Sequence, residues 1–233
     1  MIKKADQISL DEISYKINDK FFFDKISLDF SCKGITIILG PNGSGKTLLT
    51  KILKGLVKPS SGKLIIKLNN HRPNIGYMSQ NVTFLRRNVY KNLSYPLEIK
   101  GIDKKIVKEK IKFFMESFKF SGREKVSARR LSKGNKQYLS FIRTLVTQPN
   151  LLILDEPSSN LDMKSTKTIE KYLVKEKRNK KIIMVTHDLF QAKRLADEII
   201  FINEGKIIKI FPKKKFLNSP NKIVQKFLDG GLF

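Results

Sequence analysis

The sequence contains a single cysteine, Cys32, among its 233 residues. One cysteine excludes a disulfide within the chain and provides no cysteine cluster for a metal, which suits a reducing compartment such as the cytosol. We expect Cys32 to be a small, buried or half-buried side chain. Long apolar runs are also missing, because none approaches the ~18 residues of a membrane-spanning helix. The N-terminal MIKKADQISL lacks the apolar core of a secretory signal, so we expect any membrane role to be peripheral.

Acidic residues are scarce: 21 Asp and Glu stand against 47 Lys and Arg, which gives a formal net charge of +26. Such a charge is one mark of nucleic-acid binding, through release of counterions from phosphates. Here the lysines are dispersed from Lys3 to Lys226, without an aromatic-interleaved RNA-binding stretch or a zinc-finger spacing. We therefore interpret the charge as a lysine-rich surface, with attraction to anionic inner-leaflet lipid as a side effect.

Apolar patterning predicts a parallel-sheet α/β domain with a β-rich beginning. Residues 7–39 alternate apolar and polar positions, and 34–40 ends in a continuous apolar run typical of a buried strand. A glycine-rich turn and a helix over 46–55 follow. Further strands are expected over 150–155 and 181–186, helices over 165–175 and 189–196, and a closing strand pair over 198–210.

Residues 81–130 have a mostly helical pattern that interrupts this core. Within 103–120, Ile106, Ile111, Phe114 and Phe118 are predicted to form one apolar stripe, with lysines on the other face. The whole chain, 1–233, is thus expected to be one domain. Its core comprises about 1–80 and 131–233, and 81–130 forms a helical subdomain inserted in it.

The segment GPNGSGKT matches the phosphate-binding pattern G-x-x-x-x-G-K-[ST] between a strand and a helix. Glycines let backbone N–H groups wrap phosphates at a helix N-terminus, whose dipole favours anions. Lys46 is expected to reach the β- and γ-phosphates, and the Thr47 hydroxyl to bind Mg²⁺. The candidate nucleotide-binding residues are Gly40, Pro41, Asn42, Gly43, Ser44, Gly45, Lys46 and Thr47.

The segment LLILDE, residues 151–156, carries two carboxylates to the end of an apolar strand. Asp155 is placed to hold the metal, and Glu156 to polarise an attacking water as general base. An Asp-Glu pair could also begin an ordinary solvated loop, but the phosphate-binding motif makes that interpretation the weaker one.

The segment LSKGNKQ, residues 131–137, shortly before LLILDEP, resembles the signature motif and Walker B strand of ATP-binding cassette (ABC) ATPases. The resemblance covers nearly the whole chain and implies an ATPase that works as a dimer. Ser132 and Gly134 would then meet the γ-phosphate of ATP bound to a second subunit. Gln80 matches the Q-loop glutamine that contacts the metal or water. Asp162, in SNLD, matches the D-loop, and His187 the switch histidine that senses the γ-phosphate.

This chain departs from the family pattern at four positions. The signature is usually LSGGQ, whereas here Lys133 replaces the first glycine and Asn135 the glutamine; we expect Lys133 to point into solvent. Tyr138 stands where the family usually has arginine. The aromatic residue that stacks on adenine would fall near Ile17, and Tyr15 is only a weak candidate for that role. No departure removes a catalytic group, so we expect an active, though slow, ATPase.

The insertion and the short C-terminal ending resemble importer cassettes, among them those for tungstate or molybdate oxyanions. That resemblance implies a membrane permease, a solute-binding protein, a homodimer of cassettes and a peripheral position on the cytoplasmic face of the membrane. Two alternatives stay open at this point. An exporter cassette is one, since the LSKG form also appears there. The other is a non-transport ABC protein acting on nucleic acid or the ribosome, as the +26 charge suggests.

Overall fold

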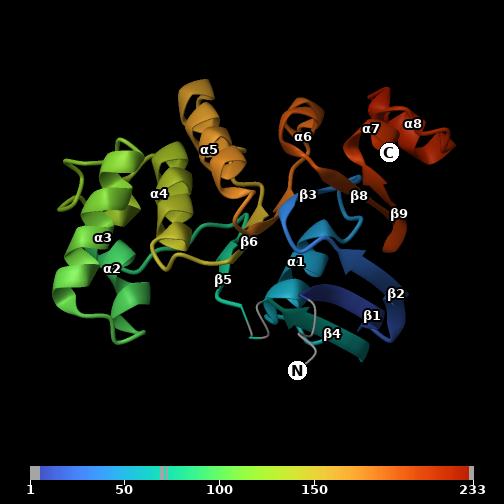
Figure 1. Ribbon diagram of the computed structural model, residues 1–233, viewed down its shortest axis with the longest axis horizontal. Helices are drawn as coiled ribbons and strands as arrows, with labels where there is room; N and C mark the ends of the chain where they lie inside the picture. Colours follow the sequence, from blue (N-terminus) through green and yellow to red (C-terminus); the bar gives the residue numbers. More distant parts are fainter. Residues whose placement is uncertain (1–5, 69–70, 72, 231–233) are drawn as a thin grey trace.

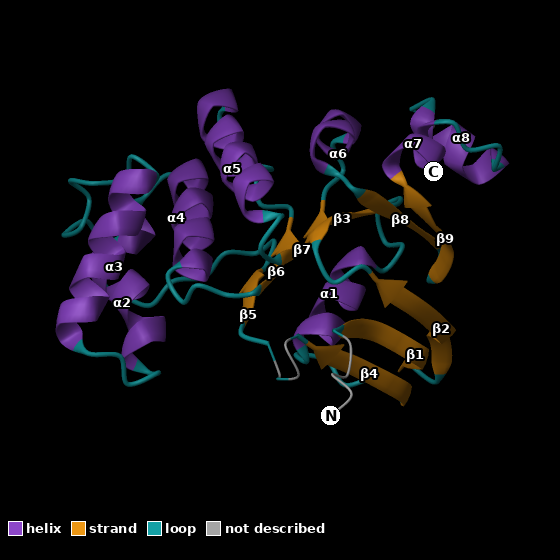
Figure 2. Ribbon diagram, in the orientation of Figure 1, coloured by secondary structure: helices purple, strands orange, loops and turns teal. Residues whose placement is uncertain are grey.

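A six-stranded sheet forms the centre of the molecule (Figures 1 and 2). The computed structural model describes residues 6–68, 71 and 73–230. Five strands are parallel, and the last one, β9, is antiparallel to its neighbour. In spatial order the strands are β5 (Ile75–Met78), β6 (Leu151–Asp155), β7 (Lys181–Val185), β3 (Gly34–Leu39), β8 (Glu198–Asn203) and β9 (Lys206–Pro212).

Both faces of this sheet are covered, which explains why its strands are continuous apolar runs. Along β6, Leu152 and Leu154 face one hydrophobic core, while Leu151 and Ile153 face the other. The second core lies between the sheet, helix α1 (Lys46–Lys54) and a three-stranded antiparallel sheet. That smaller sheet has the order β2 (Lys20–Phe30), β1 (Gln7–Ile17) and β4 (Ser61–Lys67).

The first core is covered by helices, which confirms the predicted α/β class with an antiparallel β subdomain. Helices α2 (Val89–Glu98), α3 (Lys104–Ser117) and α4 (Lys133–Leu145) lie together at one end of the molecule (Figure 1). The others are α5 (Met163–Glu176), α6 (Leu189–Leu195), α7 (Lys213–Leu217) and α8 (Lys222–Leu228). Within the described ranges, no helix has both the length and the apolar character to cross a membrane.

The helices differ from expectation in several places: α7 and α8 were not predicted, and further differences concern α3 and α4. Ile106 is 45% exposed and does not belong to the buried stripe of α3, which starts one residue later at Val107. Val107, Ile111, Phe114 and Phe118 are spaced by four, three and four residues, which keeps them on one face of a helix. Helix α4 was not among the predicted helices, because its first turn coincides with the glycine-containing LSKGNKQ segment. The side chain of Ser132 begins it as N-cap.

Candidate functional site

The phosphate-binding motif forms a tight loop between β3 and α1. Gly40 has a φ of 152°, and a Cβ there would lie 2.0 Å from the carbonyl oxygen of Ile202 in β8. Gly45 has a φ of 108°, and a Cβ there would lie 2.7 Å from the Phe22 ring in β2. Only glycine meets both requirements, because each position combines a positive φ with a close approach from a neighbouring strand.

The Lys46 ammonium lies folded back across this loop. Its Nζ donates hydrogen bonds to the carbonyl oxygens of Gly40 (2.8 Å) and Pro41 (2.6 Å). Burial lowers the pKa of Lys46, while the charges of Glu156 and Asp155 act in the opposite direction. The loop therefore presents a positive charge together with the amides at the start of α1, an arrangement suited to a polyphosphate.

Asp155 ends strand β6 beside this loop and is only 1% exposed. Neither of its carboxylate oxygens has a hydrogen bond of ordinary geometry to the described part of the chain. Burial raises the pKa of Asp155, and the Thr47 hydroxyl and Lys46 charge oppose that rise. A buried carboxylate without partners is costly on its own. Beside a hydroxyl and a phosphate loop it fits Mg²⁺, which prefers oxygen ligands and few carboxylates.

Glu156 follows in a strained conformation, with a φ of 51°. Its amide donates to the carbonyl of Val185 at the end of β7, over 3.0 Å. Its Oε1 lies 3.2 Å from Nδ1 of His187, a side chain that is 66% exposed. The turn therefore brings the carboxylate beside the imidazole that follows strand β7, an arrangement that would suit a general base with an orienting partner.

The phosphate loop, Gln80 and Glu156 border one pocket of about 280 Å³. Gln80, two residues after the end of β5, lines this pocket, and so does Glu156. The lining residues are Asn42, Gly43, Gly45, Lys46, Thr47, Leu48, Gln80, Glu156 and Val185. Parts of the chain that are far apart in sequence thus converge at the carboxyl ends of parallel strands, where ligands bind in open α/β sheets.

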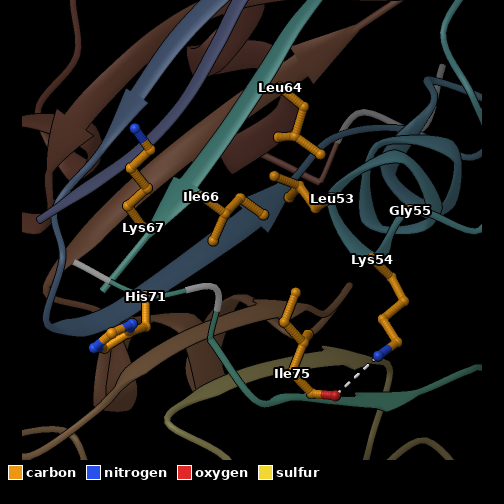
Figure 3. A pocket seen from close by; sticks show the side chains of 8 residues that line it. All are labelled: Leu53, Lys54, Gly55, Leu64, Ile66, Lys67, His71 and Ile75. Atoms are coloured by element: carbon orange, nitrogen blue, oxygen red, sulfur yellow. Dashed lines mark hydrogen bonds between the residues drawn. The ribbon is translucent and has the colours of Figure 1, made fainter. Parts of the chain in front are cut away.

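Figure 3 shows a different pocket, of about 320 Å³, between the end of α1, strand β4 and the start of β5. Lys54 borders it and donates a hydrogen bond from Nζ to the carbonyl of Ile75 over 2.9 Å. None of the residues expected to bind nucleotide or to act in catalysis lines this pocket. It has the larger volume of the two but carries none of the predicted chemistry.

Eight predicted residues do not line this pocket: Gly40, Pro41, Ser44, Ser132, Gly134, Asp155, Asp162 and His187. Five of these belong to the phosphate loop, precede Glu156 or contact it, whereas Ser132, Gly134 and Asp162 lie at the starts of α4 and α5. Ser132 is exposed at the N-terminus of α4, where its hydroxyl accepts from the amide of Asn135 (3.3 Å). Gly134 follows in the first turn of the same helix. Asp162 is the N-cap of α5, and its bond from the Ser165 amide lowers the pKa of the Asp162 carboxyl. Ser132 and Asp162 are thus exposed at the starts of two helices.

The substituted positions have clear structural surroundings. Lys133 is exposed. Tyr138 is buried, with its ring centroid 5.9 Å from those of Phe118 and Phe120, and is therefore a core residue. Ile17 is exposed at the end of β1, whereas Tyr15 pairs with Phe23 and packs on the second core.

Two residues near the site were not predicted. Gln137 is almost fully buried against the loop that begins with Glu156, and its only signal in sequence was its place within LSKGNKQ. Phe22 lies over Gly45, and nothing in the local pattern distinguished it from the neighbouring phenylalanines.

Comparison with known proteins places this geometry in a family. The family described as ABC transporter matches residues 23–159. The chain belongs to the ABC transporter family. It is 34% identical over 229 residues to a molybdate/tungstate import ATP-binding protein of Methanocaldococcus jannaschii, covering 91% of this chain and 75% of that protein. It is 32% identical over 206 residues to the ATP-binding protein of a tungstate uptake system of Peptoclostridium acidaminophilum, covering 86% and 96%.

Solved structures of ABC proteins share the fold. An ATP-binding subunit of an ABC transporter superposes with a TM-score of 0.85 at 17% identity, covering 96% of this chain and 98% of that one. A dimeric ATP-binding cassette bound to ADP and phosphate superposes with a TM-score of 0.79 at 21% identity, covering 88% and 98%. This ABC chain is accordingly an ATP-binding ATPase subunit.

Proposed function

We propose that this ABC ATPase powers solute import through a separate membrane permease, with an oxyanion of the tungstate or molybdate class as cargo. The single observation that carries its ATPase chemistry is the phosphate pocket, in which Lys46, Gln80 and Glu156 converge beside the buried Asp155. Import and the oxyanion class are supported by the two relatives named above.

In this proposal the loop from Gly40 to Thr47 holds the phosphates of ATP. Its backbone amides, at the start of α1, and the positive Lys46 ammonium would stabilise the negative phosphates. Thr47, Gln80 and Asp155 would hold Mg²⁺, which neutralises charge on the phosphate oxygens when it is bound. The Asp155 carboxylate supports this assignment, because it is buried beside Thr47 and has no hydrogen bond of ordinary geometry within the described part of the chain.

Glu156 acts as the general base for the attacking water. Its carboxylate accepts a proton from the water as the water oxygen bonds to the γ-phosphorus. The bond between the γ-phosphorus and the β–γ bridging oxygen breaks, so that ADP leaves with that oxygen. His187, 3.2 Å from Glu156, orients the base and senses the γ-phosphate. The strained backbone at Glu156 supports a functional role, since such conformations cluster at active sites.

Two chains would enclose two ATP molecules between them. Ser132 and Gly134 of one chain would contact the γ-phosphate held by the other, and Asp162 would lie at the same junction. The exposed positions of Ser132 and Asp162 at the starts of α4 and α5, where they do not line the phosphate pocket, support this division of labour. ATP hydrolysis would then separate the chains, and attached permease subunits would follow.

The helical subdomain, residues 81–130, is proposed to receive the permease. Its exposed apolar side chains include Leu85, Tyr95 and Ile99, and the Arg87 guanidinium lies 5.5 Å from the centre of the Tyr95 ring. Apolar residues exposed together are typical of contact surfaces. A peripheral position on the cytoplasmic face of the membrane, and a solute-binding protein in the complete importer, follow from the same proposal.

Glu156→Gln tests the chemistry. The amide cannot accept the proton, so kcat should fall by roughly 100-fold or more while ATP affinity is retained. The same variant should accumulate as an ATP-bound dimer in size-exclusion chromatography. Glu116→Gln, at an exposed pair with Lys112, is a matched control and should keep the parental rate. Parental turnover by Glu156→Gln would exclude Glu156 as the base.

Mixed subunits test the shared site. Lys46→Ala subunits cannot hold ATP phosphates, and Ser132→Arg subunits cannot contact the partner's ATP. A mixture should therefore recover no more activity than one intact composite site provides. Full recovery of activity would contradict the proposed dimer.

Import, export and nucleic-acid action make different predictions about partners. A neighbouring gene pair for a permease and a secreted binding protein supports import. Purification of the full chain from cells tests action on nucleic acid. RNA that stays bound at high salt, without a membrane partner, would overturn the transporter proposal.

A further inference from the structure

We propose that Gln137 is a positioning residue whose buried amide fixes the backbone of Glu156 and ties the general base to the signature helix α4. The inference rests on the proposed role of Glu156 and adds a residue that acts through it. Gln137 lies five positions after Ser132 and is 2% exposed. A buried amide must find hydrogen-bond partners, and the choice of those partners is therefore informative.

All the partners of the Gln137 amide lie on the loop that carries the base. Its Nε2 donates to the carbonyl oxygen of Glu156 (2.5 Å) and to Oγ of Ser159 (3.1 Å). Its Oε1 accepts from Nδ2 of Asn160 over 2.6 Å. Both N–H groups of the amide thus donate to residues 156–160, and its oxygen accepts one hydrogen bond from them. These bonds join the start of α4 to this loop.

The contact to the Glu156 carbonyl bears on catalysis because that residue is strained. A non-glycine residue with φ near 51° costs free energy and persists only where its surroundings hold it. Here the amide of Glu156 is held by Val185 of β7, and its carbonyl by Gln137 of α4. Both sides of the peptide backbone are therefore anchored, which sets the direction in which the carboxylate leaves toward His187.

Close packing makes this connection rigid. A Cβ on Gly134 would lie 2.7 Å from the carbonyl oxygen of Asn160, so the first turn of α4 rests directly on the loop. Since a helix moves as a unit, a shift of its N-terminus at Ser132 displaces Gln137 with it. One end of this connection faces the partner's nucleotide in the proposed dimer, and the other sets the base for the chain's own nucleotide.

Two substitutions that keep the volume of the side chain test the proposal in the full-length chain. Gln137→Met removes every polar contact, whereas Gln137→Glu keeps an acceptor for Asn160 but loses both donors. Both should lower kcat for ATP by about 10-fold or more and change KM by less than about 3-fold, because the phosphate loop is untouched. Unchanged kcat in either folded variant would overturn the proposal.

Asn92→Leu is the control for loss of a buried amide as such. Asn92 is 1% exposed in α2, and its Nδ2 donates to the backbone carbonyls of Leu85, Arg87 and Asn88, away from the site. The variant should melt at a lower temperature yet keep kcat within about 2-fold. An equal loss of kcat in Asn92→Leu would assign the Gln137 effect to general destabilisation and overturn the proposal.

A double-mutant cycle separates this inference from the proposed function. If Gln137 acts through Glu156, adding Gln137→Met to Glu156→Gln should cause no further loss of single-turnover hydrolysis, so the two effects should be strongly non-additive. Additive losses would place Gln137 outside the pathway of the base while leaving Glu156 in its role. Parental activity of Glu156→Gln alone would instead remove the proposed function.

Discussion

Two adjacent carboxylates, Asp155 and Glu156, have opposite surroundings. Asp155 completes a buried strand, has no hydrogen-bond partner of ordinary geometry among the described residues, and has a pKa raised by burial. Glu156 leaves the sheet through a positive-φ turn and meets His187. Asp155 is therefore suited to bind a metal ion, and Glu156 is suited to accept a proton. Adjacent groups of the same chemistry acquire different roles from their environment alone.

At the same scale, Phe22 is expected to support the base or ribose of ATP. Its ring lies over Gly45, and it shares a sheet face with Lys20, the cross-strand partner of the exposed Ile17. Phe22→Ala should raise the KM for ATP by about 5-fold or more, since stacking on an aromatic ring contributes roughly 1–3 kcal/mol. Its kcat should change little. Phe21→Ala, on the opposite face, is the control, and equal effects of the two would contradict the assignment.

Among the secondary-structure elements, β3, β7 and β8 are joined at the end opposite the nucleotide by a buried polar cluster. Lys181 begins β7 and is fully buried, with its Nζ donating to Glu198 (2.9 Å), to Ser31 (2.7 Å) and to Thr36. Removing one partner of such a pair leaves the other charge buried and uncompensated. The cluster fixes three central strands relative to one another.

Lys181→Met should therefore lower the free energy of unfolding by about 3–5 kcal/mol, measured by urea denaturation. Burial alone would raise the pKa of Glu198, but Lys181 and the Thr36 hydroxyl outweigh it and lower that pKa below its ordinary 4.5. A depressed carboxyl pKa stabilises the fold above pH 4.5, and this contribution is lost as the pH falls through the folded-state value. Glu198→Gln should reduce this loss of stability at acid pH. An unchanged loss would show that the cluster does not cause it.

Over the whole molecule, a net charge of +26 should produce membrane attraction that depends on salt. The full chain is expected to sediment with vesicles containing anionic lipid and not with neutral ones. Binding should be lost between about 0.1 M and 1 M salt, since the screening length falls from ~10 Å to ~3 Å over that range. Binding that persists at high salt would indicate an apolar contact in place of a general electrostatic one.

Much of the molecule could be predicted from local pattern. Continuous apolar runs identified β3, β6 and β7, since a strand covered on both faces has no polar side. The short strand β5 was not predicted, and β8 was expected only as part of the closing strand pair. The phosphate loop was equally predictable, because its glycines and its lysine act within eight consecutive residues, Gly40–Thr47. Helix α4 was not predicted, because its first turn contains a motif glycine that local pattern does not assign to a helix. The exposure of Ile106 was not predicted, because a shift of the buried face by one residue cannot be recognised without knowing what packs against the helix.

The sequence alone determined the class of fold, the phosphate loop and the resemblance to ABC ATPases, because each depends on residues close together in the chain. Tertiary structure decided which distant side chains meet. It placed Gln137 against Glu156, buried Asp155 beside the phosphate loop, and set Phe22 over that loop. Hydrogen bonding and burial depend on neighbours from other elements, and no local pattern records which neighbours packing will supply.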